Sequence, residues 1–163
     1  MASAIVALGG NVGDVRATFK KAIAHICGMA QAALVARSSD YTTPPWGDED
    51  QNPFINACIE IETSLDPHAL LFVTQKVEQK FGRIRAKERR WGPRTLDLDL
   101  IAYDDVSLKT PDLTLPHPHL FERAFVLVPL AEIAPDRMIG GRRVRDALAS
   151  VSAQGIERLP DTD

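Results

Sequence analysis

Residues 89–101 have the sequence Arg89-Arg90-Trp91-Gly92-Pro93-Arg94-Thr95-Leu96-Asp97-Leu98-Asp99-Leu100-Ile101, in which a basic loop leads directly into a strand that carries two acids. Successive side chains of a strand face opposite ways. Asp97 and Asp99 are therefore expected on one face, about 6.7 Å apart along the strand, with the leucines around them in the core. Six basic residues lie between Arg83 and Arg94. Two carboxylates beside these cations suit hard metal ions and a polyphosphate.

Alternating leucine and aspartate is also typical of a half-exposed strand that binds nothing. Two carboxylates on one solvated face repel each other and gain little, however, and here a basic loop stands at the entrance to the strand. A bound cation and a bound anion explain this arrangement better than a solvated face does.

The 163 residues are expected to form a single domain, 1–163, whose core needs no disulfide. Sparse use of cysteine, at Cys27 and Cys58 on predicted apolar faces, favours a reduced, cytoplasmic protein. The first residues lack a basic leader and no run approaches membrane-spanning length, so neither a signal peptide nor a membrane partner is expected. A net charge of -3 argues against a nucleic-acid partner. The local basic cluster instead indicates a compact anionic ligand.

Hydrophobic periodicity predicts the element order β-α-β-β-α-β. The first helix is expected to begin at a cap formed by Asp14, and the second to begin at Asp66-Pro67 and to end at Gly82. This order is the split β-α-β signature, so we expect an α+β fold with a ferredoxin-like antiparallel sheet and two helices on one face. The predicted strands are 5–8, 34–42, 54–63 and 95–103.

The remaining residues are expected to be hairpin and helical elaborations of that core. An apolar segment at 124–135 predicts a packed helix that is kinked or begins near Pro129. A small hairpin near 106–108, a short helix at 143–151 and a frayed tail at 159–163 complete the prediction.

Three connections are candidates for ligand binding. The loops 43–53 and 83–94 exceed the usual connection length, and long loops in compact domains usually bind something or close over it. The Gly-rich segment Gly9–Asp14 lacks the spacing and the Lys-Ser/Thr ending of a Walker phosphate loop. Ordinary turn chemistry explains that segment about as well as phosphate binding does.

Short motifs along nearly the whole chain share the order and spacing of one known family. They are Gly9-x-Asn11, Thr43-Pro44-Pro45, Phe54-x-Asn56, Gly82-Arg83-x-Arg85, Arg90-Trp91-Gly92-Pro93-Arg94-Thr95-x-Asp97-x-Asp99, Pro116-His117 and Arg123-x-Phe125. Together they resemble 6-hydroxymethyl-7,8-dihydropterin pyrophosphokinase of folate biosynthesis. The block from Trp91 to Asp99 is highly specific, whereas the Gly-rich turn and the Pro-His pair are weak on their own.

The resemblance implies transfer of the terminal pyrophosphoryl unit of ATP to the hydroxymethyl group of the pterin, which gives AMP and a pterin diphosphate. ATP is then a co-substrate, and two Mg²⁺ ions held by Asp97 and Asp99 are the implied cofactor. This chemistry depends on neutralised phosphate oxygens and an aligned hydroxyl. A metal-bound hydroxyl loses its proton more readily, so no dedicated basic side chain is required.

The resemblance also implies roles for individual residues. Arg83 and Arg94 join the two acids as catalytic residues, because a guanidinium fork suits phosphate oxygens. Aromatic rings would form flat walls around the pterin, and Asn56 would face its aminopyrimidinone edge. The implied pterin-binding residues are Thr43, Pro44, Trp46, Phe54, Asn56 and Phe125. The implied ATP-binding residues are Gln75, Arg85, Trp91, Arg94, Leu100, Thr114, His117 and Arg123.

Two other functions stay open on the sequence. A two-metal phosphohydrolase would use the same acids, arginines and Mg²⁺, although Phe54 with Asn56 favours the pterin. An RNA-binding ferredoxin-like module is the second alternative, but aromatic-rich basic strand motifs are absent. The expected partners are the small molecules ATP and hydroxymethyldihydropterin. The sequence does not determine the oligomeric state, for which a monomer is the expectation.

Overall fold

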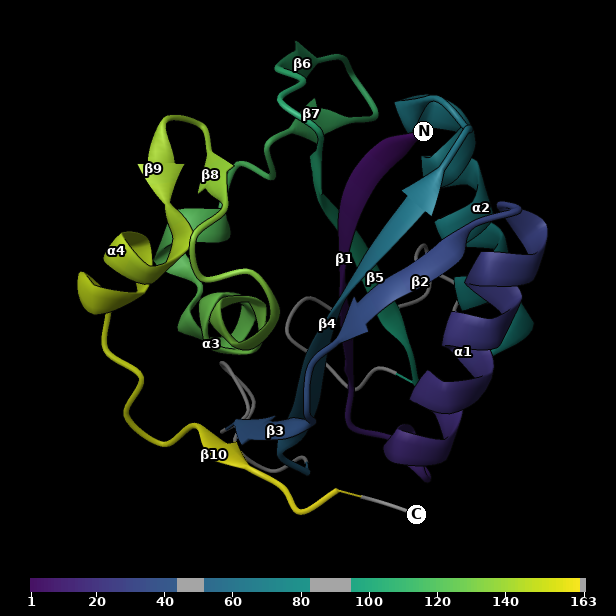
Figure 1. Cartoon of the computed structure of the whole chain (residues 1–163). Helices are drawn as coiled ribbons and strands as arrows, with labels where there is room; N and C mark the ends of the chain where they lie inside the picture. The colour runs from purple at the N-terminus through teal and green to yellow at the C-terminus, as the bar shows by residue number, and fades with distance from the viewer. Residues whose placement is uncertain (44–51, 83–94, 162–163) are drawn as a thin grey trace.

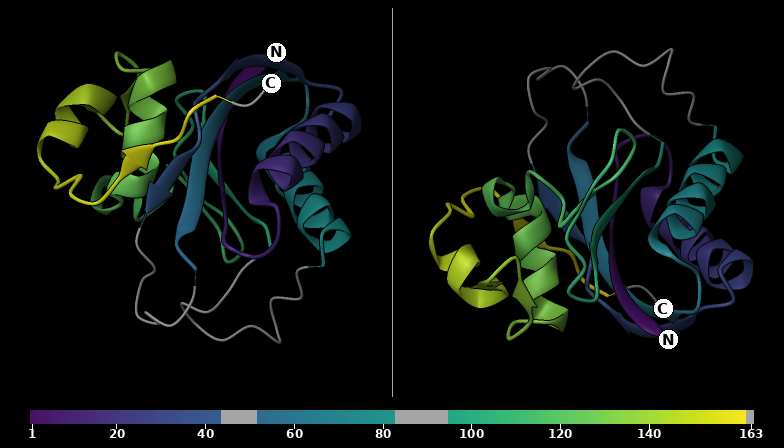
Figure 2. Two further views of the ribbon diagram at one scale, coloured as in Figure 1. Left: turned by 90° about the horizontal axis from the view of Figure 1, so that it is seen from below. Right: turned by 90° about the horizontal axis from the view of Figure 1, so that it is seen from above.

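The computed structural model describes residues 1–43, 52–82 and 95–161. A central sheet separates two helical layers, with α1 and α2 on one face and α3 and α4 on the other (Figures 1 and 2). The elements are β1 (Ala2–Gly10), α1 (Val15–Met29), β2 (Ala33–Arg37), β3 (Tyr41–Thr43), β4 (Phe54–Thr63), α2 (Pro67–Lys80), β5 (Asp97–Tyr103), β6 (Leu108–Lys109), β7 (Thr114–Leu115), a 3-10 turn (Leu120–Glu122), α3 (Ala124–Ile133), β8 (Met138–Ile139), β9 (Arg142–Arg143), α4 (Val144–Ala149) and β10 (Glu157–Arg158).

The strands of the main sheet run in the order β10-β3-β4-β1-β5, and β2 pairs with the far part of β4. Every pairing in this sheet is antiparallel. Strand β1 lies between β4 and β5 and is buried along nearly its whole length, which explains its almost wholly apolar sequence. The expected α+β fold with an antiparallel, ferredoxin-like sheet is therefore confirmed.

Helices α1 and α2 begin where their caps predict. The Asp14 carboxylate accepts a hydrogen bond from the backbone N–H of Ala17 at 3.1 Å, and the Asp66 carboxylate accepts one from Ala69 at 2.8 Å. Each bond satisfies an N–H group that has no partner within its own helix. Gly82, with φ of 88°, follows the end of α2 in the left-handed conformation that glycine adopts at low cost.

Apolar side chains fill both faces of the sheet but come from alternate residues of each strand. We call these two surfaces the α1/α2 face and the α3 face, after the helices that cover them (Figure 2). Leu96, Leu98 and Leu100 belong to the core of the α1/α2 face, so Asp97 and Asp99 between them lie on the α3 face. The α1/α2 core includes Leu8, Phe19, Ile26, Ile59, Leu70 and Leu98, and the α3 core includes Ile5, Cys58, Ile101, Leu120, Leu127 and Val144.

The prediction of one strand over residues 34–42 is wrong. The structure divides this segment into β2 and β3, both of which pair with β4 at different places. Between them, Ser38 donates its N–H to the carbonyl of Cys58 and accepts the N–H of Cys58 with its hydroxyl. Serine competes well for backbone groups in this way, so the polar segment Ser38–Asp40 interrupts the regular ladder.

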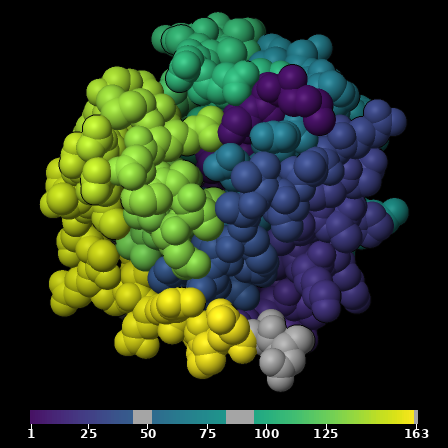
Figure 3. Space-filling model, viewed as in Figure 1, coloured from purple at the N-terminus to yellow at the C-terminus, as the bar shows by residue number. Residues whose placement is uncertain are grey.

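The C-terminal third also differs from the prediction. The hairpin pairs β6 with β7 and so begins at Leu108 and extends to Leu115, beyond the predicted 106–108. Helix α3 begins at Ala124 and continues through Pro129. The start of the tail expected to be frayed is tied down, because β10 just before it pairs with β3 and Leu159 donates its N–H to the carbonyl of Asp40 at 2.8 Å. Figure 3 shows these yellow C-terminal residues lying against the blue and purple residues of the N-terminal half. Residues 162 and 163 of that tail lie outside the described residues. Strands of two residues carry no detectable periodicity, which is why β8, β9 and β10 were not predicted.

No helix within residues 1–43, 52–82 and 95–161 is both long and apolar enough to cross a membrane.

Candidate active site

Three neighbouring strands place Asn56, Gly9 and Asp97 in one row across the sheet. Gly9 of β1 is opposite Asn56 of β4 on one side and opposite Asp97 of β5 on the other. Directly opposed residues of antiparallel strands share a face, so the amide and the carboxylate both lie on the α3 face. A Cβ atom at Gly9 would lie only 3.0 Å from Oδ1 of Asn56. Glycine therefore keeps open the space between these two polar groups.

Gly9 and Gly10 belong to the end of β1, so the turn expected over the Gly-rich segment begins only after them, with Gly13 in the left-handed conformation at φ of 73°. Sequence reasoning missed the role of Gly9 as a spacer between two functional strands. The signal was nevertheless present, because a glycine inside a strand often marks a place where a ligand or another chain segment approaches closely.

A second row, parallel to the first, contains the other acid. Ala7 of β1 is opposite Asp99 of β5 and opposite Cys58 of β4. The two carboxylates therefore lie side by side on the α3 face, as the alternation of β5 predicts. Nη1 of Arg123 is 3.8 Å from Oδ2 of Asp99, and the guanidinium carbon of Arg123 is 5.7 Å from the ring centre of Phe125. Arg123 thus connects an acid of β5 to the aromatic residue at the start of α3.

The residues implied for pterin binding gather at the other end of the first row. Asn56 is 7% exposed and donates from Nδ2 to the hydroxyl of Thr43, which is 3% exposed, at 2.9 Å. That bond fixes the amide so that its oxygen lies towards Gly9. Phe54 is opposite Thr43 in the β3–β4 pair and is half-buried, as is Phe125. The structure thus brings Thr43, Phe54 and Asn56 together at the edge of the α3 face.

His117 lies near the acids and is held by its own backbone. Its N–H donates to the carbonyl of Ile101 at 2.9 Å, and its Nδ1 accepts the N–H of His119 at 3.1 Å. Burial of the ring, followed by the positive charges of Arg123 and His119, lowers the pKa of His117 to about 4, against an opposing influence of Asp97. The imidazole is therefore neutral near pH 7, with its proton on Nε2, and can donate one hydrogen bond.

The other implied ATP-binding residues are spread more widely. Thr114 is half-buried in β7, and Gln75 lies on the exposed side of α2. Leu100 is 4% exposed within the core of the α1/α2 face, so its side chain points away from the acids. Pro44, Trp46, Arg83, Arg85, Trp91 and Arg94 lie outside the described residues.

Glu78 of α2 supports the acid-bearing strand from the opposite face. It is 2% exposed, and its Oε2 accepts the backbone N–H of Leu98, the residue between the two acids, at 2.8 Å. Because β5 is the edge strand of the main sheet, its outward N–H groups need partners from elsewhere. Glu78 supplies such a partner and so fixes the backbone that carries Asp97 and Asp99.

The donor set of the acid pair suits magnesium. Within residues 1–43, 52–82 and 95–161, no group of three or more His, Cys, Asp or Glu side chains gathers in a way that could hold a metal ion. Magnesium usually takes one or two protein carboxylates and completes its shell with water and substrate phosphates. Two adjacent aspartates are therefore a fitting donor set for Mg²⁺ that arrives with a nucleotide, and a poor one for zinc.

Comparison with known proteins agrees with this geometry. Residues 5–135 match the family model described as 7,8-dihydro-6-hydroxymethylpterin-pyrophosphokinase. The 2-amino-4-hydroxy-6-hydroxymethyldihydropteridine pyrophosphokinase of Methylorubrum extorquens is 51% identical over 159 residues, which cover 98% of this chain and 99% of that protein. The Bacillus subtilis protein of the same name is 46% identical over 130 residues, which cover 80% of this chain and 77% of that one.

Solved structures share the fold at much lower identity. A crystal structure of Plasmodium falciparum HPPK-DHPS with pteroate matches 91% of this chain with a TM-score of 0.70 and 13% identity. This chain spans 42% of that longer one, and the likeness shows the fold alone. The match of the family model over most of the chain and the near full-length relative settle the family. This chain belongs to the 7,8-dihydro-6-hydroxymethylpterin-pyrophosphokinase family.

Proposed function

We propose that this protein transfers pyrophosphate from ATP to the hydroxymethyl group of 6-hydroxymethyl-7,8-dihydropterin, giving AMP and the pterin diphosphate for folate biosynthesis. The observation that carries the proposal is the row Asn56, Gly9 and Asp97 in a chain of the pyrophosphokinase family. Two inter-strand steps separate the amide from the acid, which is about 10 Å. A bicyclic heterocycle bound at the amide can extend its hydroxymethyl arm to the acids over that distance.

The pterin pocket that we propose has Asn56 at its centre. With Nδ2 engaged by Thr43, Oδ1 of Asn56 is available to accept hydrogen bonds from the amino and ring N–H groups of an aminopyrimidinone. Phe54 and Phe125 are half-buried and would provide the flat walls above and below the ring. Thr43, Pro44 and Trp46 are assigned to the same pocket by the resemblance to the family, although Trp46 lies just outside the Thr43-Pro44-Pro45 motif.

Asp97 and Asp99 are the proposed ligands of two Mg²⁺ ions. When bound, these ions neutralise phosphate oxygens and favour loss of the proton from the attacking hydroxyl. The two carboxylates hold fixed positions because β5 is paired to β1 on one side and tied to Glu78 on the other. Arg83 and Arg94 are proposed to bind oxygens of the phosphates that are transferred. Arg85 and Trp91 are proposed to contact ATP as well.

Arg123 and His117 are proposed to orient the nucleotide beside the acids. Arg123 is 3.8 Å from Asp99, so it can meet phosphate oxygens that approach the same carboxylate. Neutral His117 can donate from Nε2 to a sugar or phosphate oxygen without adding charge. Thr114 and Gln75 stay in the proposed ATP site through the overall resemblance to the family, since neither lies in a quoted motif, and Leu100 can contribute through its backbone.

Several broader expectations remain proposals as well. A single domain over residues 1–163 is supported by the one sheet that both helical layers share. A monomer that acts in the cytoplasm on small molecules, without nucleic acid, is consistent with the free thiols of Cys27 and Cys58. Sedimentation at several concentrations tests the monomer, and a dimer at all of them would contradict it.

The experiment that tests the function is a nucleotide assay with ATP and Mg²⁺, with and without hydroxymethyldihydropterin. AMP that forms only when the pterin is present supports pyrophosphoryl transfer. ADP as the product, or nucleotide breakdown without the pterin, would instead indicate a kinase of another type or a phosphohydrolase. Turnover that keeps rising after each ATP carries one Mg²⁺ supports the second ion, and saturation at one equivalent argues against it.

A further inference from the structure

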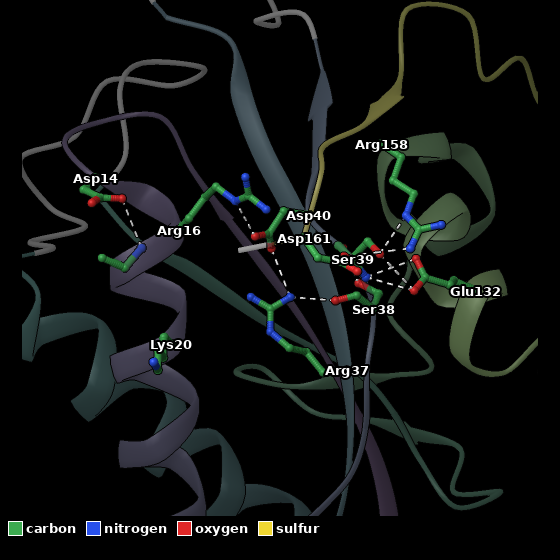
Figure 4. Close-up of a pocket in the computed structure, with 11 residues that line it drawn as sticks. Asp14, Arg16, Lys20, Arg37, Ser38, Ser39, Asp40, Glu132, Arg158 and Asp161 are labelled. Atoms are coloured by element: carbon green, nitrogen blue, oxygen red, sulfur yellow. Dashed lines mark hydrogen bonds and ion pairs between the residues drawn. The ribbon is translucent and has the colours of Figure 1, made fainter. Parts of the chain in front are cut away.

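A charged cavity of about 700 Å³ lies at the opposite end of β3 from Thr43, between α1, α3 and the C-terminal residues (Figure 4). Its basic and acidic residues are equal in number, so the lining offers no net charge to attract an ionic ligand. We therefore interpret its contacts as a network that joins elements of the fold. The charged lining residues are Arg16, Lys20, Arg37 and Arg158, with Asp14, Asp40, Glu132 and Asp161.

Glu132 is the part of this network that joins α3 to the β3 segment. Both of its carboxylate oxygens accept the backbone N–H of Ser39 at 3.0 Å, and Oε2 also accepts the Ser39 hydroxyl at 3.2 Å. Oε1 accepts the hydroxyl of Tyr41 at 2.6 Å. Glu132 of α3 thus bonds to Ser39 and to Tyr41, two residues further along the chain. Figure 4 shows the bonds to Ser39.

The position of Glu132 within α3 is unfavourable for the helix itself. It lies in the last turn of α3, where the helix dipole disfavours negative charge. A contribution of Glu132 to helix stability therefore does not explain an acid here. The four hydrogen bonds to Ser39 and Tyr41 do explain it, and they are charge-assisted and strong.

The two elements that this contact joins, α3 and the β3 segment, both contribute residues to the proposed pterin pocket. Tyr41 is opposite Asn56 in the β3–β4 pair, and Thr43, which holds the Asn56 amide, is two residues further along β3. Phe125 precedes Glu132 by seven residues in α3, which is two helical turns, so both project from the same side of the helix.

We infer that Glu132 is a positioning residue for the pterin, which fixes the distance between Phe125 on α3 and the Thr43–Asn56 pair on the sheet. This inference rests on the proposed function, because it assigns a purpose to the pocket proposed there. The acids are held differently, because their strand β5 is paired with β1 and bonded to Glu78 of α2. The contact of Glu132 with the β3 segment therefore acts on the pterin half of the site.

The test compares Glu132→Ala, Glu132→Gln and Tyr41→Phe with the unchanged protein. Glu132→Ala removes all four bonds and is expected to raise KM for the pterin about tenfold, the equivalent of about 1.4 kcal/mol. Turnover at saturation and KM for ATP should stay within about twofold. Glu132→Gln keeps an acceptor for Tyr41 and should restore most of the loss, and Tyr41→Phe, which loses one bond of the four, should show an intermediate rise.

A general loss of protein stability must be distinguished from a displacement of the pterin-binding residues. Thr63→Val serves as the matched control, because Thr63 is buried, donates its hydroxyl to Ala30 at 3.1 Å and lies at the far end of β4. It should lower the melting temperature without changing KM for the pterin. Calorimetric affinity for the pterin, measured with a non-reacting ATP analogue, should weaken in Glu132→Ala in parallel with KM.

Each outcome has a separate meaning. If the unchanged protein makes no AMP from ATP and the pterin, the proposed function fails and this inference fails with it. If the unchanged protein is active but Glu132→Ala only melts earlier, with KM and calorimetric affinity for the pterin unaltered, the function stands and Glu132 is merely structural. Equal rises in KM for ATP and for the pterin would also overturn the assignment to the pterin half.

Discussion

The two faces of the central sheet are built from alternate residues of the same strands, yet they differ in chemistry. On the α1/α2 face, β1, β4 and β5 contribute an apolar set that includes Leu8, Ile59 and Leu98. On the α3 face, the same strands contribute apolar residues such as Ile5, Cys58 and Ile101 and also carry the row Asn56, Gly9 and Asp97. Both faces contribute hydrophobic burial to the stability of the fold, but only the α3 face also carries this row.

This difference teaches that adjacent residues can have separable effects. A side chain of β5 that faces α1 and α2 loses hydrophobic burial when it is shortened, and its loss should appear in the free energy of unfolding. Its neighbour on the α3 face loses an electrostatic contact to ligands, and its loss should appear in turnover. Substitutions one residue apart are therefore the most direct way to test the division.

The largest effect is expected for Asp97→Ala and Asp99→Ala. Each removes a proposed magnesium ligand, so turnover at saturating ATP and Mg²⁺ should fall on the order of a hundredfold or more. The melting temperature should change little, because both side chains lie outside the leucine core. Steady-state AMP production measures the loss of turnover, and a thermal melt of each variant measures the change in melting temperature. A folded variant with near-normal turnover would contradict the metal assignment.

Leu98→Ala, between the two acids, should show the opposite pattern. Leu98 is 2% exposed, and shortening a buried leucine costs about 2–5 kcal/mol of the free energy of unfolding. Denaturant titration measures this loss. Turnover measured well below the melting temperature should remain within about twofold of the unchanged protein. A folded Leu98→Ala protein as inactive as Asp97→Ala would show that the two faces are not separable.

Gly9→Ala tests the open space between the amide and the acid. The added methyl group would lie 3.0 Å from Oδ1 of Asn56, so the amide must shift or the pterin must bind less closely. We expect KM for the pterin to rise about fivefold, which is about 1 kcal/mol. Gly28→Ala is the control, because a Cβ there meets nothing within 4 Å and alanine is the better residue in helix α1. That variant should have normal KM and equal or greater stability.

The smallest effect concerns the two tyrosines, one on each face. Burial first, and then the hydrogen bond and charge of Glu132, raise the pKa of Tyr41 to about 12. Burial also raises the pKa of Tyr103, which packs against the α1/α2 core and donates to the carbonyl of Leu65. Absorbance titration of Tyr103→Phe and Tyr41→Phe proteins follows each phenol alone.

Glu132→Gln should lower the pKa of Tyr41 and leave that of Tyr103 unchanged. A pKa that is raised by folding means that the folded state favours the neutral phenol. The stabilisation is therefore complete below pH 10 and is lost as the pH rises from about 10 to about 12. Equal shifts at both tyrosines would mean that Glu132→Gln loosens the whole protein and not one contact.

The sequence predicted the parts of this molecule whose signals are local. The alternation of Leu96 to Asp99 places the acids correctly, and Asp14 and Asp66 cap the helices as predicted. Local rules suffice there because the period of a strand and the bonding of a cap depend on a few neighbouring residues.

The parts that the sequence did not predict depend on distant partners. The break between β2 and β3 arises because Ser38 bonds to Cys58. Residues 157–159 are held in place because β10 pairs with β3 and Leu159 bonds to Asp40. Glu132 could not be assigned a role from local sequence, since its significance depends on what lies across the sheet. Gly9 inside a strand did signal a close approach, but which residue approaches it depends on the pairing of β1 with β4. The roles of the proposed site residues came from the resemblance to the family and remain predictions, including those of Arg83, Arg94 and Trp91.

The row that joins Asn56, Gly9 and Asp97 also has a consequence for how the protein acquires activity. Its three members come from β4, β1 and β5, which are far apart along the chain, so the row has high contact order. Bringing strands together across such long chain segments costs entropy before any contact compensates for it. Strand β5 can pair with β1 only after all the residues between them have been synthesised. No N-terminal fragment that ends before β5 can contain the complete row. Ligands that bind across the row favour the sheet in which β4, β1 and β5 are all paired, so they stabilise these long-range pairings.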